Sequence, residues 1–367
     1  MHSVFSWLCC FLSVGTLFDS SESVRVTFSS PTVIPLENRE DIYYVARATV
    51  GNEELDVVMD SGSLETVIIS SVCDYCGPKQ HLYHPANSAT HQNTNDVSQQ
   101  SYGSGELLTR LAFDNVKIGT STLAKASMWE VVDAYMPLLQ ESDFAGIFGL
   151  GPYPPNIEVI SFNDYASSGS ASGGNGGAAA PQKVKNENAS TSLQWQLGLN
   201  VYSLCLNSGP GSPGQLIFND NAVEQHGDAF HTVPVLPGLP WWAAELSEVK
   251  LGDQTIECGG SSCAAVIDSG TSLLAVPAFV RLVIASMLQA KGIECSNLAE
   301  APPLHFKLGG KDFSLPARFY IGEVFGALST EMSGQFDVGD DGCAALFQDF
   351  NEQVPDVGAL WILGMPF

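Results

Sequence analysis

Short runs of hydrophobic residues fill most of the chain, separated by clusters of glycine, proline, asparagine and aspartate. Examples are Ile42–Val50, Glu54–Met59 and Thr66–Ser70, in which β-branched and aromatic side chains are frequent. Such runs are typical of strands, and the residues between them are typical of turns. One segment, Pro277 to Lys291, instead has hydrophobic positions spaced for a helix, and a glycine follows its end. The pattern therefore predicts an all-β protein with few helices.

Residues 161–190 break this pattern with a low-complexity sequence of serine, glycine, alanine and asparagine. This composition predicts a flexible surface loop. The glycines are not followed by Gly-Lys-Ser/Thr, so a phosphate-binding loop is not indicated. The segment also contains the sequon Asn188-Ala189-Ser190, which predicts a glycan at Asn188 if the protein is secreted.

Length and charge limit the class of protein. A chain of 367 residues is long enough for two domains. It carries 40 Asp and Glu against 15 Lys and Arg, a net charge of −25. Phosphate groups would be repelled by this charge, which argues against nucleic acid and anionic membrane surfaces as partners.

The N-terminus has an apolar run from Val4 to Phe18, which is the length of a signal-peptide core and short for a membrane span. We expect residues 1–20 to be a cleaved signal peptide and residues 21–40 a short polar segment. An uncleaved anchor or an incorrect start is the alternative. No later stretch is apolar for long enough to span a bilayer.

The chain has nine cysteines, and two of them lie in the N-terminal apolar run. Six others fall into three candidate pairs. Two pairs, Cys73 with Cys76 and Cys258 with Cys263, would each close a small loop, and Cys295 with Cys343 would be the third. Cys205 remains, in an apolar run typical of a buried free thiol. Pairs that close small loops favour an oxidising compartment, although the sequence does not display the connectivity.

A zinc site is the alternative for the first pair, because Cys73 and Cys76 are followed by His81 and His84. Thiolates two residues apart do bind zinc. The gap between cysteine and histidine is much shorter than in zinc fingers, however, and the context is secretory. We therefore expect a disulfide here and no metal.

An internal repeat is the most informative feature of the sequence. Val57–Ser63 reads Val-Val-Met-Asp-Ser-Gly-Ser and returns as Ala-Val-Ile-Asp-Ser-Gly-Thr at Ala265–Thr271. Gly-Ile-Phe-Gly at 146–149 follows the first copy, and Trp-Ile-Leu-Gly at 361–364 follows the second at a similar spacing. The recurrence predicts a duplicated lobe, with one aspartate on a tight turn after an apolar strand in each copy.

These two aspartates, Asp60 and Asp268, can act together if their turns face each other. Like charges held that close cannot both ionise, so the pair shares one proton. One carboxylate can then accept a proton from water while the other donates a proton to a carbonyl oxygen. This chemistry hydrolyses a peptide bond without a metal or a covalent intermediate.

The repeated motifs resemble those of the pepsin-like aspartic endopeptidases. Asp-Ser-Gly-Ser at 60–63 and Asp-Ser-Gly-Thr-Ser-Leu-Leu at 268–274 look like the two active-site turns of that family. Tyr-Gly-Ser-Gly at 102–105 looks like the tip of its flap, the hairpin that closes over substrate. The resemblance runs from about Tyr43 to Phe367, and the three cysteine pairs match disulfides of the family.

The resemblance implies a bilobal all-β fold with the active-site cleft between two homologous lobes. The N-terminal lobe would cover residues 41–208, including the insert at 161–190, and the C-terminal lobe residues 209–367. The family normally continues for roughly 25 residues more, so we expect the natural chain to extend past Phe367. A monomer is the expected state for this architecture.

The resemblance also assigns roles to residues. Asp60 and Asp268 would be the catalytic pair. Their supporting residues would be Ser61, Gly62, Ser63, Ser269, Gly270 and Thr271, with the hydroxyls of Ser63 and Thr271 bonded to the outer carboxylate oxygens. Tyr102, Gly103 and Ser104 would bind the main chain of an extended substrate. No cofactor is implied.

The predicted function is thus an acidic-pH aspartic endopeptidase that acts on polypeptides, secreted or in an endomembrane or vacuolar lumen. Five positions depart from the family pattern. Ser61 and Ser269 stand where threonine is usual, Val67 stands where a tryptophan usually supports the flap tyrosine, and Glu65 follows an atypical Leu64. These departures favour the alternative, a catalytically impaired protein that binds peptides or proteins.

Overall fold

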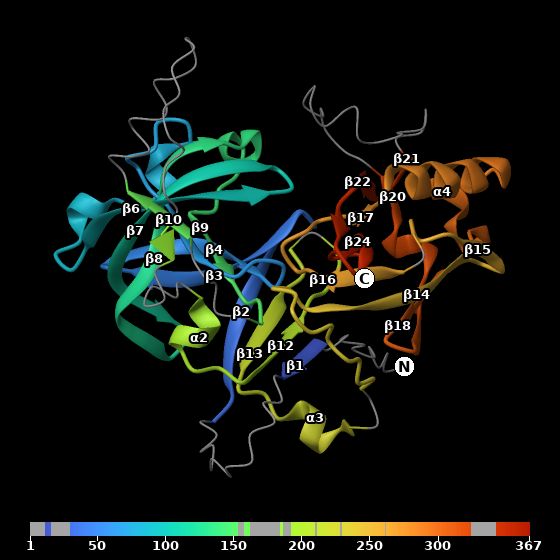
Figure 1. The fold of residues 1–367 in the computed structure, drawn as a ribbon, viewed down its shortest axis with the longest axis horizontal. Helices are drawn as coiled ribbons and strands as arrows, with labels where there is room; N and C mark the ends of the chain where they lie inside the picture. The colour runs from blue at the N-terminus through green and yellow to red at the C-terminus, as the bar shows by residue number, and fades with distance from the viewer. Residues whose placement is uncertain are drawn as a thin grey trace, which may run out of the picture. The chain divides into compact units, whose positions relative to one another are not determined.

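The computed structural model describes residues 12–15, 30–152, 158–161, 184–185, 192–209, 211–227, 230–260, 262–323 and 343–367. The chain divides into two compact units, Met1–Gly227 and Asp228–Phe367. They are coloured blue to yellow and yellow to red, respectively, in Figure 1.

The described elements of the first unit are mostly strands. They are β1 (Leu12–Gly15), β2 (Thr32–Arg39), β3 (Tyr43–Val50), β4 (Glu53–Asp60), β5 (Thr66–Ile69), β6 (Gln92–Tyr102), β7 (Gly105–Ile118), β8 (Ser121–Tyr135), β9 (Gly146–Gly149), β10 (Glu158–Ser161), β11 (Val184–Lys185), β12 (Val201–Cys205) and β13 (Gly214–Phe218). The α-helices are α2 (Leu193–Gln196) and α3 (Ala222–Gln225), and the 3₁₀ turns are η1 (Lys79–His81), η2 (Pro85–Asn87) and η3 (Pro137–Gln140).

The second unit has a similar make-up. Its described strands are β14 (Ala243–Leu251), β15 (Gln254–Ile256), β16 (Cys263–Ile267), β17 (Leu274–Val276), β18 (Leu304–Leu308), β19 (Lys311–Leu315), β20 (Ile321–Glu323), β21 (Cys343–Ala345), β22 (Phe347–Asp349), β23 (Gln353–Val354) and β24 (Gly358–Leu363). Its helices are α4 (Ala278–Ala290) and the 3₁₀ turns η5 (Cys295–Glu300) and η6 (Ala317–Phe319).

Each unit is organised around one large sheet. Within the described residues, the first unit has a 13-stranded sheet in the order β1-β12-β13-β2-β3-β4-β9-β5-β8-β7-β6-β10-β11. The second has a nine-stranded sheet in which β19-β18-β14-β16-β24-β17-β22 form the main path. The all-β fold with two lobes is therefore confirmed. The predicted helix is α4, with Pro277 before it and Gly292, at a φ of +65°, after it.

The internal repeat corresponds to a repeated strand arrangement. β4 lies parallel to β9, and β5 lies antiparallel to the other side of β9. In the second unit β16 lies parallel to β24, and β17 lies antiparallel to β24. Strands paired on both edges and covered on both faces are hydrophobic throughout rather than alternating, which explains the apolar runs before both aspartates.

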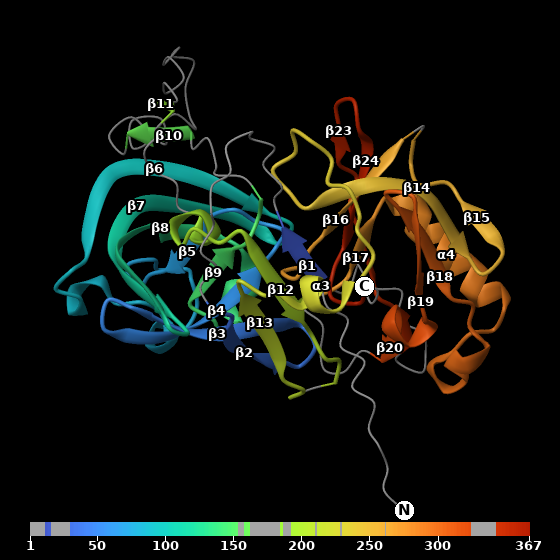
Figure 2. The same ribbon diagram turned by 90° about the horizontal axis from the view of Figure 1, so that it is seen from below.

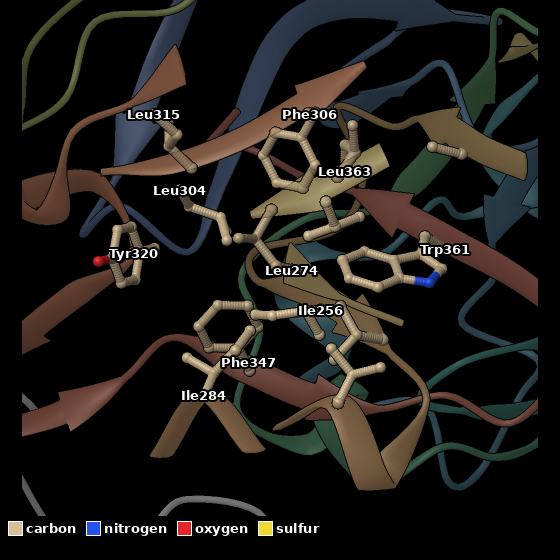
Figure 3. Close-up of a cluster of buried hydrophobic side chains, with 14 of the residues drawn as sticks. Ile256, Leu274, Ile284, Leu304, Phe306, Leu315, Tyr320, Phe347, Trp361 and Leu363 are labelled. Carbon is tan, nitrogen blue, oxygen red and sulfur yellow. The ribbon is translucent and has the colours of Figure 1, made fainter. Parts of the chain in front are cut away.

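Two hydrophobic clusters support these strands. In the first unit, Val67 and Trp129 are fully buried in one cluster with neighbouring side chains of β7 and β9. In the second unit, Trp361 of β24 packs against Phe306 of β18 with ring centroids 6.2 Å apart, and Leu274 lies beside them (Figure 3). Both clusters include side chains of the repeated strands, so burial of these side chains fixes the position of each Asp-Ser-Gly turn.

The three predicted disulfides are present: Cys73–Cys76, Cys258–Cys263 and Cys295–Cys343. Cys205 is buried on β12 and lies outside the three disulfides of the described residues. Because Cys73 and Cys76 are bonded to each other, their sulfurs are not thiolate ligands, and the zinc alternative loses its two strongest donors.

The division between the units falls later than the predicted boundary after residue 208. β13 follows that boundary in sequence, but it pairs with both β12 and β2 of the first unit. Strand pairing thus keeps this segment with the N-terminal lobe. Within the expected signal peptide, Leu12–Gly15 forms β1, which pairs with β12. Most of the insert at 161–190, including Asn188, lies outside the described residues.

Candidate active site

The first Asp-Ser-Gly turn places Asp60 at the last position of β4. Its side chain is buried, and carboxylate Oδ1 accepts a hydrogen bond of 2.8 Å from the main-chain N–H of Gly62. Its main-chain oxygen accepts a bond of 2.7 Å from the N–H of Leu150, just after β9. The turn is therefore held both by its own glycine and by the segment that crosses behind it.

The second turn repeats this geometry. Asp268 follows β16, is buried, and its Oδ1 accepts a bond of 2.7 Å from the N–H of Gly270. Its main-chain N–H donates to the carbonyl of Leu363 on β24, at 3.0 Å. Each unit thus presents one buried aspartate oriented by the glycine two residues later.

The two turns differ at the fourth residue. Thr271 Oγ1 donates to Asp268 Oδ2 at 2.6 Å, the bond that the family resemblance implies. Ser63, the corresponding residue, has a buried hydroxyl with no hydrogen-bond partner among the described residues. Threonine is restricted at χ1 by its branched Cβ, whereas serine is not, so the serine hydroxyl is not directed to the carboxylate in the same way.

Because Gly149 and Gly364 have no side chains, the ends of the β9 and β24 segments can lie close to the two turns. A Cβ added at Gly149 would come within 2.4 Å of the carbonyl carbon of Leu64, and one added at Gly364 within 2.2 Å of the oxygen of Leu273. Contacts this short exclude any side chain. The glycines at the ends of the two repeated segments are thus required by packing. The residues after the aspartates, Ser61 and Ser269, are both buried.

The flap-like segment is the tip of a long hairpin. β6 and β7 run side by side as curved strands, with Tyr102 opposite Gly105 at their ends (Figure 2). Gly103 and Ser104 are exposed at the turn. Gly105 has a φ of +146°, and a Cβ there would come within 2.2 Å of the oxygen of Tyr135. The hairpin therefore needs glycine at this position.

Tyr102 lies close to the first aspartate. Burial raises the pKa of Tyr102 well above its usual value near 10, and the charges of Glu65 and Asp60 raise it further. Its hydroxyl lies 3.3 Å from Gln100 Oε1. The structure thus brings two of the predicted site residues, Asp60 and Tyr102, into one neighbourhood within the first unit, while Asp268 belongs to the second.

Sequence reasoning did not place Trp129 in the buried cluster against which the flap tyrosine packs. Val67 on β5 stands opposite Trp129 on β8, and Tyr102 packs against the cluster that contains both. The cluster thus contains an indole on the strand next to β5, whereas the family resemblance looked for one at position 67. Only the pairing of β5 with β8 shows that Trp129 lies beside Val67.

Glu65 is a second residue whose place the sequence did not reveal. It lies in the loop between β4 and β5, and its main-chain oxygen accepts a bond of 2.9 Å from Gly149. Burial raises the pKa of its carboxyl, against the opposing effect of hydrogen bonds from the N–H groups of Glu65 and Leu64. The atypical Leu-Glu pair of the sequence therefore places a glutamate on the residue that is bonded to Gly149, the ladder partner of Asp60.

Other classes of site find little support in the described part of the chain. No group of three or more His, Cys, Asp or Glu side chains there is arranged to hold a metal ion. No helix in the same residues is long and apolar enough to cross a membrane.

Comparisons with known proteins agree with this geometry. A family model for eukaryotic aspartyl proteases matches residues 43–367. Pepsin A of Suncus murinus is 28% identical over 350 residues, covering 91% of this chain and 78% of the relative. Pepsin II-1 of Oryctolagus cuniculus is 26% identical, with coverage of 94% and 80%. Cathepsin E of Aquarana catesbeiana is 24% identical, with coverage of 91% and 76%.

Proposed function

Because the chain belongs to the eukaryotic aspartyl protease family, we propose that it is an aspartic endopeptidase whose catalytic pair is Asp60 and Asp268. The observation that carries the proposal is the matched hydrogen bonding of the two turns. Gly62 donates to Asp60 as Gly270 donates to Asp268, at nearly equal distances. Each turn thus supplies one buried, oriented carboxyl group, and a shared-proton pair needs two.

The reaction follows from that shared proton. One carboxylate accepts a proton from water as the water oxygen attacks the carbonyl carbon of the substrate. The other carboxyl group gives its proton to the carbonyl oxygen, and a neutral diol forms. The carboxyl group that took up the proton from water then gives it to the amide nitrogen, while the other carboxylate accepts a proton from a diol hydroxyl; the carbon–nitrogen bond breaks, and an acid and an amine leave. The Gly62 and Gly270 N–H groups hold the carboxylates in place throughout.

The substrate is proposed to be an extended polypeptide that adds as a strand beneath the flap. The exposed Gly103 and Ser104 would pair with its main chain, and Tyr102 would cover the side chain beside the scissile bond. A preference for apolar residues at that bond rests on analogy with the family. Ser61, Ser269, Ser63 and Thr271 would support the two aspartates.

The setting is proposed to be the extracellular space or an endomembrane or vacuolar lumen. The three disulfides support an oxidising compartment, and the net charge of −25 suits an acidic one. We propose that the protein acts as a monomer, without nucleic acid or cofactor, and carries a glycan at Asn188.

A protein that binds peptides without cleaving them is the second candidate. One observation favours it: the buried hydroxyl of Ser63 has no partner among the described residues, so Ser63 does not make the bond that Thr271 makes to Asp268. Turnover would be lower without this bond at the first turn, while a peptide could still add as a strand.

A peptide-library digestion between pH 3 and pH 7, with and without pepstatin, tests the proposal. The panel is the wild type, Asp60→Asn, Asp268→Asn and, as a matched control, Asp74→Asn, whose side chain is 81% exposed. We expect pepstatin-sensitive cuts with the wild type and the control, and none with the other two. Activity retained by either site variant contradicts the catalytic pair. No cuts from a folded wild type that still binds peptides favours the second candidate.

A further inference from the structure

Glu65 and Asp60 lie on opposite sides of one residue, Gly149. Asp60 pairs with Gly149 in the parallel ladder between β4 and β9. On the other side, the N–H of Gly149 donates to the carbonyl of Glu65 at 2.9 Å. A Cβ added at Gly149 would come within 2.7 Å of the main-chain nitrogen of Glu65. The backbones that carry the two carboxyl groups are therefore fixed at the end of the same short strand.

The flap tyrosine belongs to the same neighbourhood. Tyr102 packs against the cluster that contains Val67, two residues after Glu65. The charges of both Glu65 and Asp60 act on its phenol. Three titratable groups, from the ends of β4 and β6 and the loop before β5, thus share one partly buried site.

We propose that Glu65 is a positioning residue of the active site: its ionisation is coupled to that of Asp60, and it sets the upper pH limit of peptide hydrolysis. The inference rests on the proposed function, because it concerns the proton that the catalytic pair must keep.

The direction of the effect follows from charge repulsion. As the pH rises, an ionised Glu65 makes the loss of the proton shared by the catalytic pair less favourable. The pair then keeps its working proton to a higher pH than it would alone. At low pH Glu65 is neutral, because burial raises its pKa, and it has no effect. In the first unit, Asp60 lies across Gly149 from Glu65, and Tyr102 is acted on by the charges of both; the strands β5 and β9 carry no titratable residue.

The test is the pH profile of kcat/KM for four proteins: the wild type, Glu65→Gln, Glu65→Asp and Glu141→Gln. Glu141 is an exposed glutamate in the same unit, so its variant removes one charge away from the site. In Glu65→Gln the high-pH limb should move to lower pH by about 0.5 to 1 unit, as expected for like charges in a partly buried site. The low-pH limb should stay in place.

The two other variants separate a local effect from a general one. Glu65→Asp keeps a carboxyl group and should retain most of the wild-type profile, and Glu141→Gln should match the wild type. A high-pH limb that does not move in Glu65→Gln, or that moves to higher pH, overturns the proposal. Equal shifts in Glu65→Gln and Glu141→Gln also overturn it, because the effect would then come from net charge.

An NMR titration of the aspartate carboxyl groups tests this inference independently of the proposed function. The aspartate carboxyl carbons are labelled with ¹³C and titrated in the wild type, Asp60→Asn and Glu65→Gln. The resonance lost in Asp60→Asn identifies Asp60, and its midpoint should fall in Glu65→Gln. If the wild type cleaves nothing, the proposed function fails, yet a lowered Asp60 midpoint still supports the coupling. An unchanged midpoint overturns the coupling whether or not the protein is active.

Discussion

A single methyl group distinguishes the two active-site turns at the residue scale. Thr271 donates to Asp268, while Ser63 has a buried hydroxyl with no partner among the described residues. Ser63→Thr should direct its hydroxyl to Asp60, because the branched side chain restricts χ1. A hydrogen bond to a charged group contributes about 1.5 kcal/mol or more, so kcat/KM should rise up to about tenfold. Steady-state kinetics at the pH optimum measures the change.

The reverse substitution is the matched control. Thr271→Ser should lower kcat/KM by a comparable factor, because it gives the second turn the chemistry of the first. If both variants equal the wild type, the fourth residue of the turn does not orient the aspartate in the way the structure suggests. The unfolding temperature of each variant shows whether a change in rate reflects the site or the fold.

At the scale of the element, the flap hairpin depends on one of its two tip glycines. Gly105 has a φ of +146° and no room for a Cβ beside Tyr135, whereas Gly103 has no atom within 4 Å of that position. Gly105→Ala should therefore destabilise the hairpin by about 1 to 3 kcal/mol, and Gly103→Ala should leave stability unchanged. Hydrogen exchange of the β6 and β7 amides measures the difference. Equal protection in the two variants contradicts it.

The surroundings of Val67 on β5 argue against a substitution that the sequence suggests. From the sequence, Val67→Trp would supply the missing support for Tyr102. In the structure Val67 is fully buried opposite Trp129, so a second indole has no space. Val67→Trp should cost about 1 to 3 kcal/mol of stability through overpacking, without a gain in kcat. Chemical denaturation measures the first and steady-state kinetics the second; a stable variant with higher kcat contradicts this interpretation.

The same strands show what a sequence can and cannot reveal. The Asp-Ser-Gly turns were predictable because a short motif, an apolar strand and a glycine-bounded partner segment recur together along the chain. The place of Trp129 beside Val67 and the placement of Glu65 were not, because each depends on which strands pair and in what register. Register joins positions such as Val67 and Trp129 that are distant along the chain, and no local pattern encodes it.

For the whole molecule, the number of thiols that react with a labelling reagent tests the removal of residues 1–20 and the disulfide pairing together. Cys205 is buried and outside the three disulfides. The secreted protein, denatured without reductant, should therefore show one free thiol by thiol-specific labelling. Three thiols would mean that Cys9 and Cys10 remain and that residues 1–20 are not removed. None would mean that Cys205 is blocked or bonded, and peptide mapping by mass spectrometry would locate the partner.

The pH dependence of stability should carry two opposite contributions, from Glu65 and Asp114. Because burial raises the pKa of Glu65, its carboxyl group contributes fully to the stability of the fold below its usual pKa. This contribution is lost as the pH rises. Glu65→Gln should raise the unfolding temperature at pH 7 and leave it unchanged at pH 4. Burial alone would raise the pKa of Asp114, but hydrogen bonds from Thr90 and Tyr83 outweigh it and lower the pKa.

The contribution of Asp114 is therefore present above its usual pKa and lost as pH falls. Asp114→Asn should cost about 2 kcal/mol at neutral pH, the scale of hydrogen bonds to a charged acceptor, and less at pH 3. Calorimetric unfolding of both variants and the wild type at pH 3, 4 and 7 measures the two trends. Because they have opposite signs, a general effect of removing one negative charge from a chain at −25 cannot produce both. Parallel trends in the two variants would show that net repulsion, and not these two sites, governs the stability of the molecule.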